Sequence, residues 1–144
     1  MTIWRHLPDI EEVNQIGANS MVELLGIIVT EIGEDYLKGT MPVDNRTLQP
    51  HGILHGGASV ALAETLGSIA STLCLDTDKQ YCVGLGINSS HVRPISSGKV
   101  TGTVKPVHVG RTIHVWNIDI SADHGKLISV SRLTMAILNK SPGS

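Results

Sequence analysis

The sequence predicts an α+β domain in which one long apolar helix packs on a six-stranded antiparallel sheet. Three observations lead to this class. Large apolar residues recur at helical spacing over residues 58–73, six segments are rich in β-forming residues, and short turn-like linkers join the last four of these segments. The helix must bury its apolar stripe, and one face of the sheet is the only surface large enough. The 144 residues have the length of one domain, which we expect to span 1–144.

Two short helical segments are expected near the N-terminus. Asp9 can cap the first amide groups of a helix over residues 9–16, and Gly17 can end it. A second helical turn follows at residues 20–25. The next two β-rich segments are separated by the turn-like residues 33–35 and therefore predict a hairpin. The hairpin strands are residues 26–32 and 36–43.

The long helix follows an irregular stretch. Residues 44–57 contain Pro50 and three glycines without helical periodicity, which predicts a loop. In the helix after it, the apolar stripe has spacings of four, three and four residues. This stripe consists of Leu62, Leu66, Ile69 and Leu73. The opposite side carries Ala61, Glu64, Thr65 and Ser68, and its small residues, including Ala58 and Ala61, would let another backbone or a ligand approach closely.

Four strands complete the predicted fold, at residues 81–93, 98–109, 112–122 and 126–138. Their short linkers favour antiparallel pairing of each strand with the next one along the chain. The strand over 98–109 alternates, with one side formed by Val100, Gly102, Val104 and Pro106. Gly84 and Gly86 lie inside a strand pattern, where glycine indicates a bulge or a close approach of another group.

Composition excludes several classes of protein. The formal net charge is −2 and no block of Lys or Arg stands out, so no nucleic-acid partner is expected. Glu64 interrupts the longest apolar run before it reaches the ~18 residues of a membrane span, so no membrane partner is expected either. Two cysteines and an N-terminus without signal-peptide features favour the reducing cytoplasm. The chain has no Phe, so its core must be aliphatic.

Glu64 is the first candidate for chemistry. A carboxylate inside an otherwise uncharged helix is costly to bury without a partner, so water or substrate should reach it. Such a group can act as a general base or as a nucleophile, and the sequence leaves both routes open. The alternative is an ordinary exposed charge on the helix.

The start of the long helix is the second candidate. Gly56 and Gly57 precede it, and the first amide groups of a helix lack internal partners and favour negative charge. They could form an oxyanion hole, or the glycines could serve only the turn into the helix. His51 and His55 have a spacing that would suit a metal on a helix, but Gly52 argues against a helix there. We therefore expect neither a metal nor another cofactor.

Several segments together are specific for one family. They are IWRH, MPVDNRTLQP, QPHGILHGGASVALAE, AETLGS, INSSHVRP, GKV, KPVHVGR and SRLTMAIL, and they are distributed along nearly the whole chain. In these segments the sequence resembles the hotdog-fold thioesterases of the phenylacetate-pathway type, which include enzymes of menaquinone biosynthesis and of enterobactin proofreading. The resemblance implies hydrolysis of an acyl-CoA with an aromatic or medium-sized acyl group. An acyl carrier protein is the other possible thioester carrier.

The resemblance also implies roles for particular residues. Glu64 would be the catalytic carboxylate, the Gly56 amide would polarise the thioester carbonyl, and His55 would support that amide. Gln49 would orient the water or the acyl oxygen, and Ser68 would line the acyl pocket. CoA would be bound by a second set of residues, with the pantetheine along one strand and the phosphates on a basic patch where neighbouring strand ends converge. This set is Val83, Gly84, Asn88, His91, Arg93, His108 and Arg111. Ordinary solvated strand-end charges are the alternative for the basic members.

Helix geometry adds an expectation about assembly. Gly56 and Glu64 are eight residues apart, which is about 12 Å along a helix axis. The oxyanion donor and the attacking group must reach the same thioester, so we expect a homodimer with shared active sites. The family favours a dimer of dimers, a homotetramer. Two other functions stay open: a hydratase or dehydratase that uses His51 or His55 with Glu64, and a CoA-ester binding protein without turnover.

Overall fold

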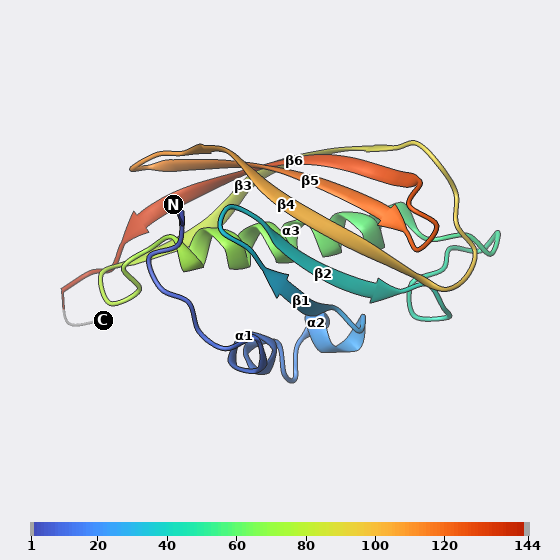
Figure 1. The fold of residues 1–144 in the computed structure, drawn as a ribbon, viewed down its shortest axis with the longest axis horizontal. Helices are drawn as coiled ribbons and strands as arrows, with labels where there is room; N and C mark the ends of the chain where they lie inside the picture. The colour runs from blue at the N-terminus through green and yellow to red at the C-terminus, as the bar shows by residue number, and fades with distance from the viewer. Residues whose placement is uncertain (1, 143–144) are drawn as a thin grey trace.

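The computed structural model describes residues 2–142 and contains three helices and six strands in these residues (Figure 1). The helices are α1 (Ile10–Ile16), α2 (Met21–Leu24) and α3 (Gly56–Leu73). The strands are β1 (Ile28–Ile32), β2 (Leu37–Pro42), β3 (Gln80–His91), β4 (Lys99–Val109), β5 (Ile113–Ala122) and β6 (Leu127–Asn139). Every predicted element is present, with bounds that differ from the prediction by a few residues.

The strands form one antiparallel sheet in the order β1-β2-β4-β5-β6-β3. The long helix α3 lies along one face of this sheet, and α1 and α2 lie below it next to β1 (Figure 1). This is the expected hotdog arrangement, and the α+β fold class is confirmed. None of the helices in residues 2–142 is long and apolar enough to cross a lipid bilayer.

The helix α3 is held on the sheet by a close fit at Leu66. Gly39 of β2 and Gly102 of β4 face each other across the two strands. A Cβ atom at Gly39 would lie 2.5 Å from one methyl of Leu66, and a Cβ at Gly102 would lie 2.7 Å from the other. Both positions therefore require glycine so that the fully buried Leu66 can sit directly on the sheet.

The position of β3 corrects the sequence-based prediction. We expected the strand over 81–93 to pair with the strand over 98–109, but β3 pairs with β6. The physical reason is that β2 and β5 already occupy both edges of β4, which leaves β6 as the free edge. The linker over 92–98 crosses the end of the sheet, where the Ile95 carbonyl accepts a hydrogen bond from the Leu54 amide at 2.8 Å.

The N-terminal segment is anchored to the core by stacked tryptophans. The rings of Trp4 and Trp116 are 6.3 Å apart and nearly parallel, and the Trp4 indole donates a 2.6 Å hydrogen bond to the Gly33 carbonyl. Both side chains are buried in the core, so the expectation of a purely aliphatic core was wrong. The expected capping of α1 by Asp9 is absent. Asp9 occupies the position before α1, but its side chain makes no capping hydrogen bond.

A buried polar cluster lies beneath the C-terminal end of α3. The Ser71 hydroxyl accepts a 2.7 Å hydrogen bond from the Trp116 indole and lies 2.9 Å from Nδ1 of His114. Burial lowers the pKa of His114 below its ordinary value of 6.5, and the nearby His108 lowers it further. A neutral imidazole suits this cluster, because it can accept the hydroxyl proton of Ser71.

Candidate active site

Glu64 lies at the edge of a large cavity. Its side chain is exposed on the side of α3 that faces away from the hydrophobic core. The carboxylate reaches toward β3, where a Cβ atom at Gly84 would lie only 3.2 Å from Oε1. Glycine at this position therefore makes room for the carboxylate, and the register shift between Gly84 and Gly86 confirms the expected bulge. Glu64 is accessible, as the sequence suggested.

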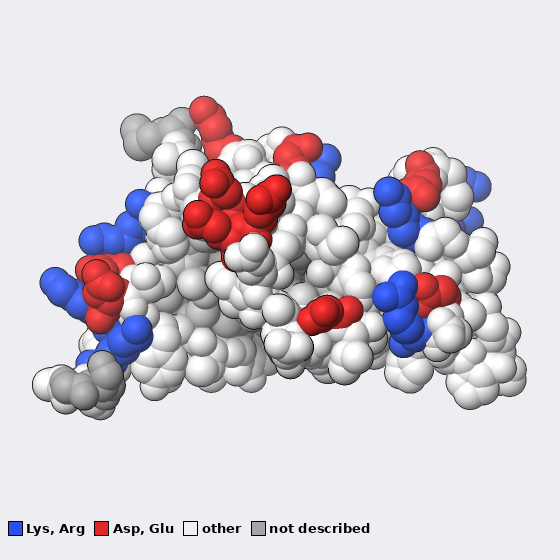
Figure 2. Space-filling view, turned by 90° about the horizontal axis from the view of Figure 1, so that it is seen from below, with Lys and Arg blue, Asp and Glu red and all other residues white. Residues whose placement is uncertain are grey.

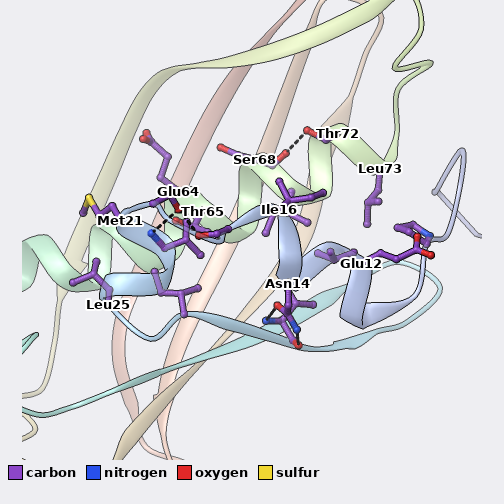
Figure 3. A pocket seen from close by; sticks show the side chains of 18 of the residues that line it. Glu12, Asn14, Ile16, Met21, Leu25, Glu64, Thr65, Ser68, Thr72 and Leu73 are labelled. Carbon is purple, nitrogen blue, oxygen red and sulfur yellow. Dashed lines mark hydrogen bonds between the residues drawn. The ribbon is translucent and has the colours of Figure 1, made fainter.

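The cavity separates α3 from the two short helices. Its volume is about 680 Å³, within the range of roughly 300–1,000 Å³ of small-molecule pockets. The α3 wall runs from Ala61 to Leu73, about 18 Å along the helix axis, and the opposite wall comes from α1, α2 and β1. Met21 lies beside Glu64 at one end, and Glu12 lies near Leu73 at the other (Figure 3).

The helix side that was predicted to admit another backbone or a ligand forms this α3 wall. The cavity is lined by Ala61, Glu64, Thr65 and Ser68, whereas Ala58 is buried in the core. Ser68 lies one turn after Glu64, and its nearest hydrogen-bond acceptor is the sulfur of Met135 at 3.9 Å, a weak contact. Ile69, which we assigned to the core stripe, packs against the core and also lines the cavity. Leu62 and Leu66 are fully buried, as predicted.

The N-terminus of α3 lies away from Glu64. His55 is the residue before the helix, and its Nδ1 accepts a 2.8 Å hydrogen bond from the Gly57 amide. A Cβ atom at Gly56 would lie 2.9 Å from Nε2 of His91, so the imidazole of His91 fills the space that glycine leaves. The helix begins at Gly56, two residues earlier than predicted. The Gly56 amide consequently lies in its first turn.

Gln49 belongs to the same end of the molecule. Its side-chain oxygen accepts a hydrogen bond from the His51 amide, and its backbone bonds to Gly52 and Ile53 close a tight turn. The His55 amide bonds to the Thr47 carbonyl at 2.8 Å, which ties this loop to the start of α3. The side-chain amide of Gln49 keeps its NH₂ donors for another partner.

The predicted site residues therefore fall into two sets within one chain. The first set, at the start of α3, is Gln49, His55, Gly56 and His91. The second set, at the cavity, is Glu64, Ser68 and Gly84. Gly56 and Glu64 are separated by about 12 Å along α3, as the helix rise predicted.

The predicted basic patch is not assembled within one chain. His91 pairs with Ser129 near the start of β6, whereas Thr112, next to Arg111, bonds to Ile137 near its end. These two points of β6 are about 26 Å apart. Arg93 follows His91 and His108 precedes Arg111, so the four basic residues lie at opposite ends of the sheet. Our expectation of neighbouring strand ends failed because β3 and β4 are not neighbours.

The strand β3 forms an edge of the sheet and exposes apolar side chains. Val83 and Leu85 are 41% and 60% exposed, and the strand has no neighbour on its outer side in the described residues. The pairing of β3 with β6 determines which face of the sheet each residue occupies. Gly84 faces α3, whereas Val83 and Asn88 lie on the other face. A long apolar edge of this kind is a template for pairing with another strand.

The second cavity wall was not predicted from the sequence. It consists mainly of residues from the two short helices, among them Asn14, Ile16 and Met21. Ile16 is 82% exposed and Met21 is 60% exposed, which is unusual for large apolar residues beside a cavity. Acidic side chains gather over α1, whose first turn carries Glu11 and Glu12 (Figure 2). The polar start and the apolar spacing of these two short helices are the signals from which such a wall could have been predicted.

The chemistry of the described residues points to carboxylate and amide groups. Across residues 2–142, no group of three or more His, Cys, Asp or Glu side chains is placed to hold a metal ion. Cys74 and Cys82 are free thiols, and burial raises the pKa of Cys74 to about 11, which keeps it protonated and unreactive at neutral pH. Glu64 beside an apolar cavity is left as the candidate for attack on a substrate.

Comparisons with known proteins find one matching family. Residues 51–129 match the model of the family described as the thioesterase superfamily. The 1,4-dihydroxy-2-naphthoyl-CoA hydrolase of Escherichia coli is 49% identical over 136 residues, which are 94% of this chain and 99% of that protein. A proofreading thioesterase of Cronobacter sakazakii is 48% identical over 136 residues, covering 94% of this chain and 98% of its own length.

A solved structure is also very similar. The crystal structure of a mutant thioesterase from Pseudomonas aeruginosa superposes with a TM-score of 0.95 at 50% identity. The match covers 96% of this chain and 100% of that one. The architecture and nearly the whole length of the chain are therefore shared with a thioesterase.

Proposed function

The chain belongs to the thioesterase superfamily, and on that premise we propose that it hydrolyses acyl-CoA to a free acid and CoA, with Glu64 as the catalytic carboxylate. Membership makes the chain a thioester hydrolase. The observation that carries the proposal is an accessible carboxylate at the edge of an apolar cavity. The whole chain would act as one hydrolase domain.

Each proposed group has one task in the reaction. Glu64 takes the proton of a water molecule whose oxygen attacks the thioester carbon, or it attacks that carbon itself to give an anhydride that water then opens. The Gly56 amide stabilises the negative charge on the former carbonyl oxygen. In both routes the C–S bond breaks and CoA leaves as its thiol. His55 supports the helix start by accepting from Gly57, and Gln49 offers its NH₂ donors to the acyl oxygen or the water.

The cavity would hold the acyl group. Its wall is largely apolar, and its ionisable side chains are those of His6, Glu12 and Glu64, without Lys or Arg. An acyl group with its own carboxylate would meet no Lys or Arg there and would be repelled by Glu12 and Glu64, so the proposed substrates are uncharged. Ser68 would contact the acyl group near the reacting carbon. The relative from Escherichia coli is named for an aromatic acyl-CoA, which supports an aromatic substrate, and with it menaquinone biosynthesis, for this chain.

We place the complete site between two chains that pair through β3. Glu64 contacts Gly84, and Gly56 contacts His91, so the two sets of site residues lie beside two points on the same strand. If two copies of β3 pair antiparallel around an axis near Ile87, Gly84 faces the partner's His91. Glu64 then lies opposite the partner's Gly56. The exposed apolar edge of β3 supports this pairing.

The same pairing would gather the CoA-binding residues. Arg93 lies just after the end of β3. In this pairing the partner's Arg93 would lie beside Cys82, which pairs with Ile137 of β6. Thr112, next to Arg111, bonds to that same Ile137. Basic residues that are distant within one chain would thus approach across the dimer and could bind the CoA phosphates. Val83 and Asn88 would lie along the pantetheine.

A thiol-release assay tests the proposed reaction. Purified protein is given a panel of acyl-CoA esters, including benzoyl-CoA, hexanoyl-CoA and glutaryl-CoA, and free CoA is measured with a thiol reagent. We expect turnover of the two uncharged esters and little turnover of glutaryl-CoA. Absence of CoA release from every ester would contradict the acyl-CoA substrate class.

A further inference from the structure

The structure points to a residue that controls which acyl groups are accepted. Resting on the thioesterase function proposed above, we propose that Asn14 is a positioning residue that sets the width of the acyl cavity. It does so by joining α1 to the edge strand β1. Asn14 does not contact the reacting atoms in this proposal, and its effect passes through the helix that carries it.

Asn14 bonds to both backbone groups of one residue. Its Oδ1 accepts a 2.8 Å hydrogen bond from the Val29 amide, and its Nδ2 donates a 3.0 Å hydrogen bond to the Val29 carbonyl. β1 is the outermost strand on its side of the sheet, so the asparagine amide takes the place of a neighbouring strand. An amide side chain is the right group for this, because it carries one donor group and one acceptor group.

These two bonds locate one wall of the cavity. α1 packs on β1, while the cavity lies between the short helices and α3. Figure 3 shows Asn14 and Ile16 on α1 opposite Ser68 and Thr72 on α3. The gap between the two walls therefore depends on where α1 sits on β1, and the Asn14 bonds are the polar contacts that hold it there.

The exposed apolar residues on this wall indicate what fills the gap. Ile16 and Met21 line the cavity and remain 82% and 60% exposed. An acyl group bound between the walls would cover such side chains. A small acyl group would touch mainly the α3 side near Glu64, whereas a bulky one would also touch α1. Displacement of α1 should consequently affect large substrates more than small ones.

The test is the dependence of KM and kcat on acyl size in Asn14→Ala. Acetyl-CoA, hexanoyl-CoA and benzoyl-CoA are compared by CoA release. We expect KM to rise more steeply as the acyl group becomes larger, so that the preference for benzoyl-CoA over acetyl-CoA in kcat/KM falls by about tenfold. The kcat values should fall less than the KM values rise, because the residues around the thioester are not changed.

Two further variants complete the experiment. Asn14→Asp keeps the acceptor for the Val29 amide but loses the donor, so we expect a smaller shift in the same direction. Gln15→Ala, an exposed neighbour on α1 that does not line this cavity, should retain the wild-type preference. Thermal unfolding checks that each variant is folded.

The possible failures are distinguishable. If wild-type protein is active and Asn14→Ala loses activity equally for all three esters, or keeps the wild-type preference, the role of Asn14 is overturned while the proposed reaction stands. If wild-type protein releases CoA from no ester, the proposed reaction fails and the inference fails with it.

Discussion

At the scale of single residues, Glu64 has the combination of accessibility and apolar surroundings that suits a reactive carboxylate. Replacing it by glutamine keeps its size but removes its ability to accept a proton or to attack carbon. We expect Glu64→Gln to lower kcat at least ~100-fold with an unchanged melting temperature. CoA release under saturating substrate is the measurement. Turnover near that of the wild type would remove Glu64 from the mechanism.

His114 should make stability depend on pH. Burial lowers its pKa in the folded state, so the unfolded state binds the proton more readily. The contribution of neutral His114 to stability is complete above its ordinary pKa of 6.5 and is lost as the pH falls below that value. We therefore expect the free energy of unfolding to decrease between about pH 7.5 and about pH 5.5, and to decrease less in His114→Gln.

Denaturant unfolding at several pH values provides this comparison. His124→Gln is the matched control, because His124 is an exposed histidine in a turn, where its Nδ1 accepts from the Lys126 amide. The control should follow the wild-type pH dependence. Equal slopes for His114→Gln and the wild type would show that the buried imidazole is not the titrating group.

At the scale of elements, the contact between α3 and the sheet depends on the glycine pair beneath Leu66. In Gly102→Ala the new methyl would meet Leu66, whose other methyl is already held against Gly39. Leu66 cannot rotate away, so we expect a loss of about 1–3 kcal/mol in the free energy of unfolding. Thr103→Ala, on the other face of the same strand, should change it by no more than about 0.5 kcal/mol. Chemical denaturation measures both, and equal values would contradict the close fit.

Local pattern was enough to predict the elements but not all of their neighbours. The spacing of Leu62 and Leu66 predicted α3 and its buried face, and the loop glycines predicted where it begins to within two residues. The pairing of β3 could not be read in this way, because it depends on which strand edge is still free after β2, β4 and β5 have paired. For the same reason, the prediction that Arg93 and Arg111 converge was wrong for a single chain.

The candidate site was predictable only in part. Glu64 and the glycines before α3 could be named because an isolated charge and a glycine pair are visible in a linear sequence. The cavity wall made by α1 and α2 was not visible, since it depends on a gap between elements that are distant in the chain. Asn14 in particular looks like an ordinary helix residue until its bonds to Val29 are seen.

At the scale of the whole molecule, the two sets of site residues require two chains in our proposal. Mixing Glu64→Ala with Gln49→Ala tests this, because each variant alone should be inactive. In a hybrid dimer, one shared site carries both defects and the other carries none. With random exchange we expect about a quarter of the wild-type activity to return, since half of the dimers are hybrids with one intact site each.

The result depends on proof that hybrids form. The two variants carry different affinity tags, are refolded together, and are purified over both tags in sequence. Purified hybrids should then have about half of the wild-type activity per dimer. Hybrids that remain inactive would contradict the shared site, because sites contained within single chains would each keep one defect.

The tryptophan pair gives the molecule an optical property. The chain has two tryptophans, and these are stacked on each other, with Trp116 inside the core and Trp4 on the N-terminal segment. Intrinsic fluorescence excited at the indole band therefore reports one location rather than the average of the fold. A red shift of the emission signals that the N-terminal segment has left β5. Neither tryptophan lines the acyl cavity, so a bound substrate is better followed by another probe.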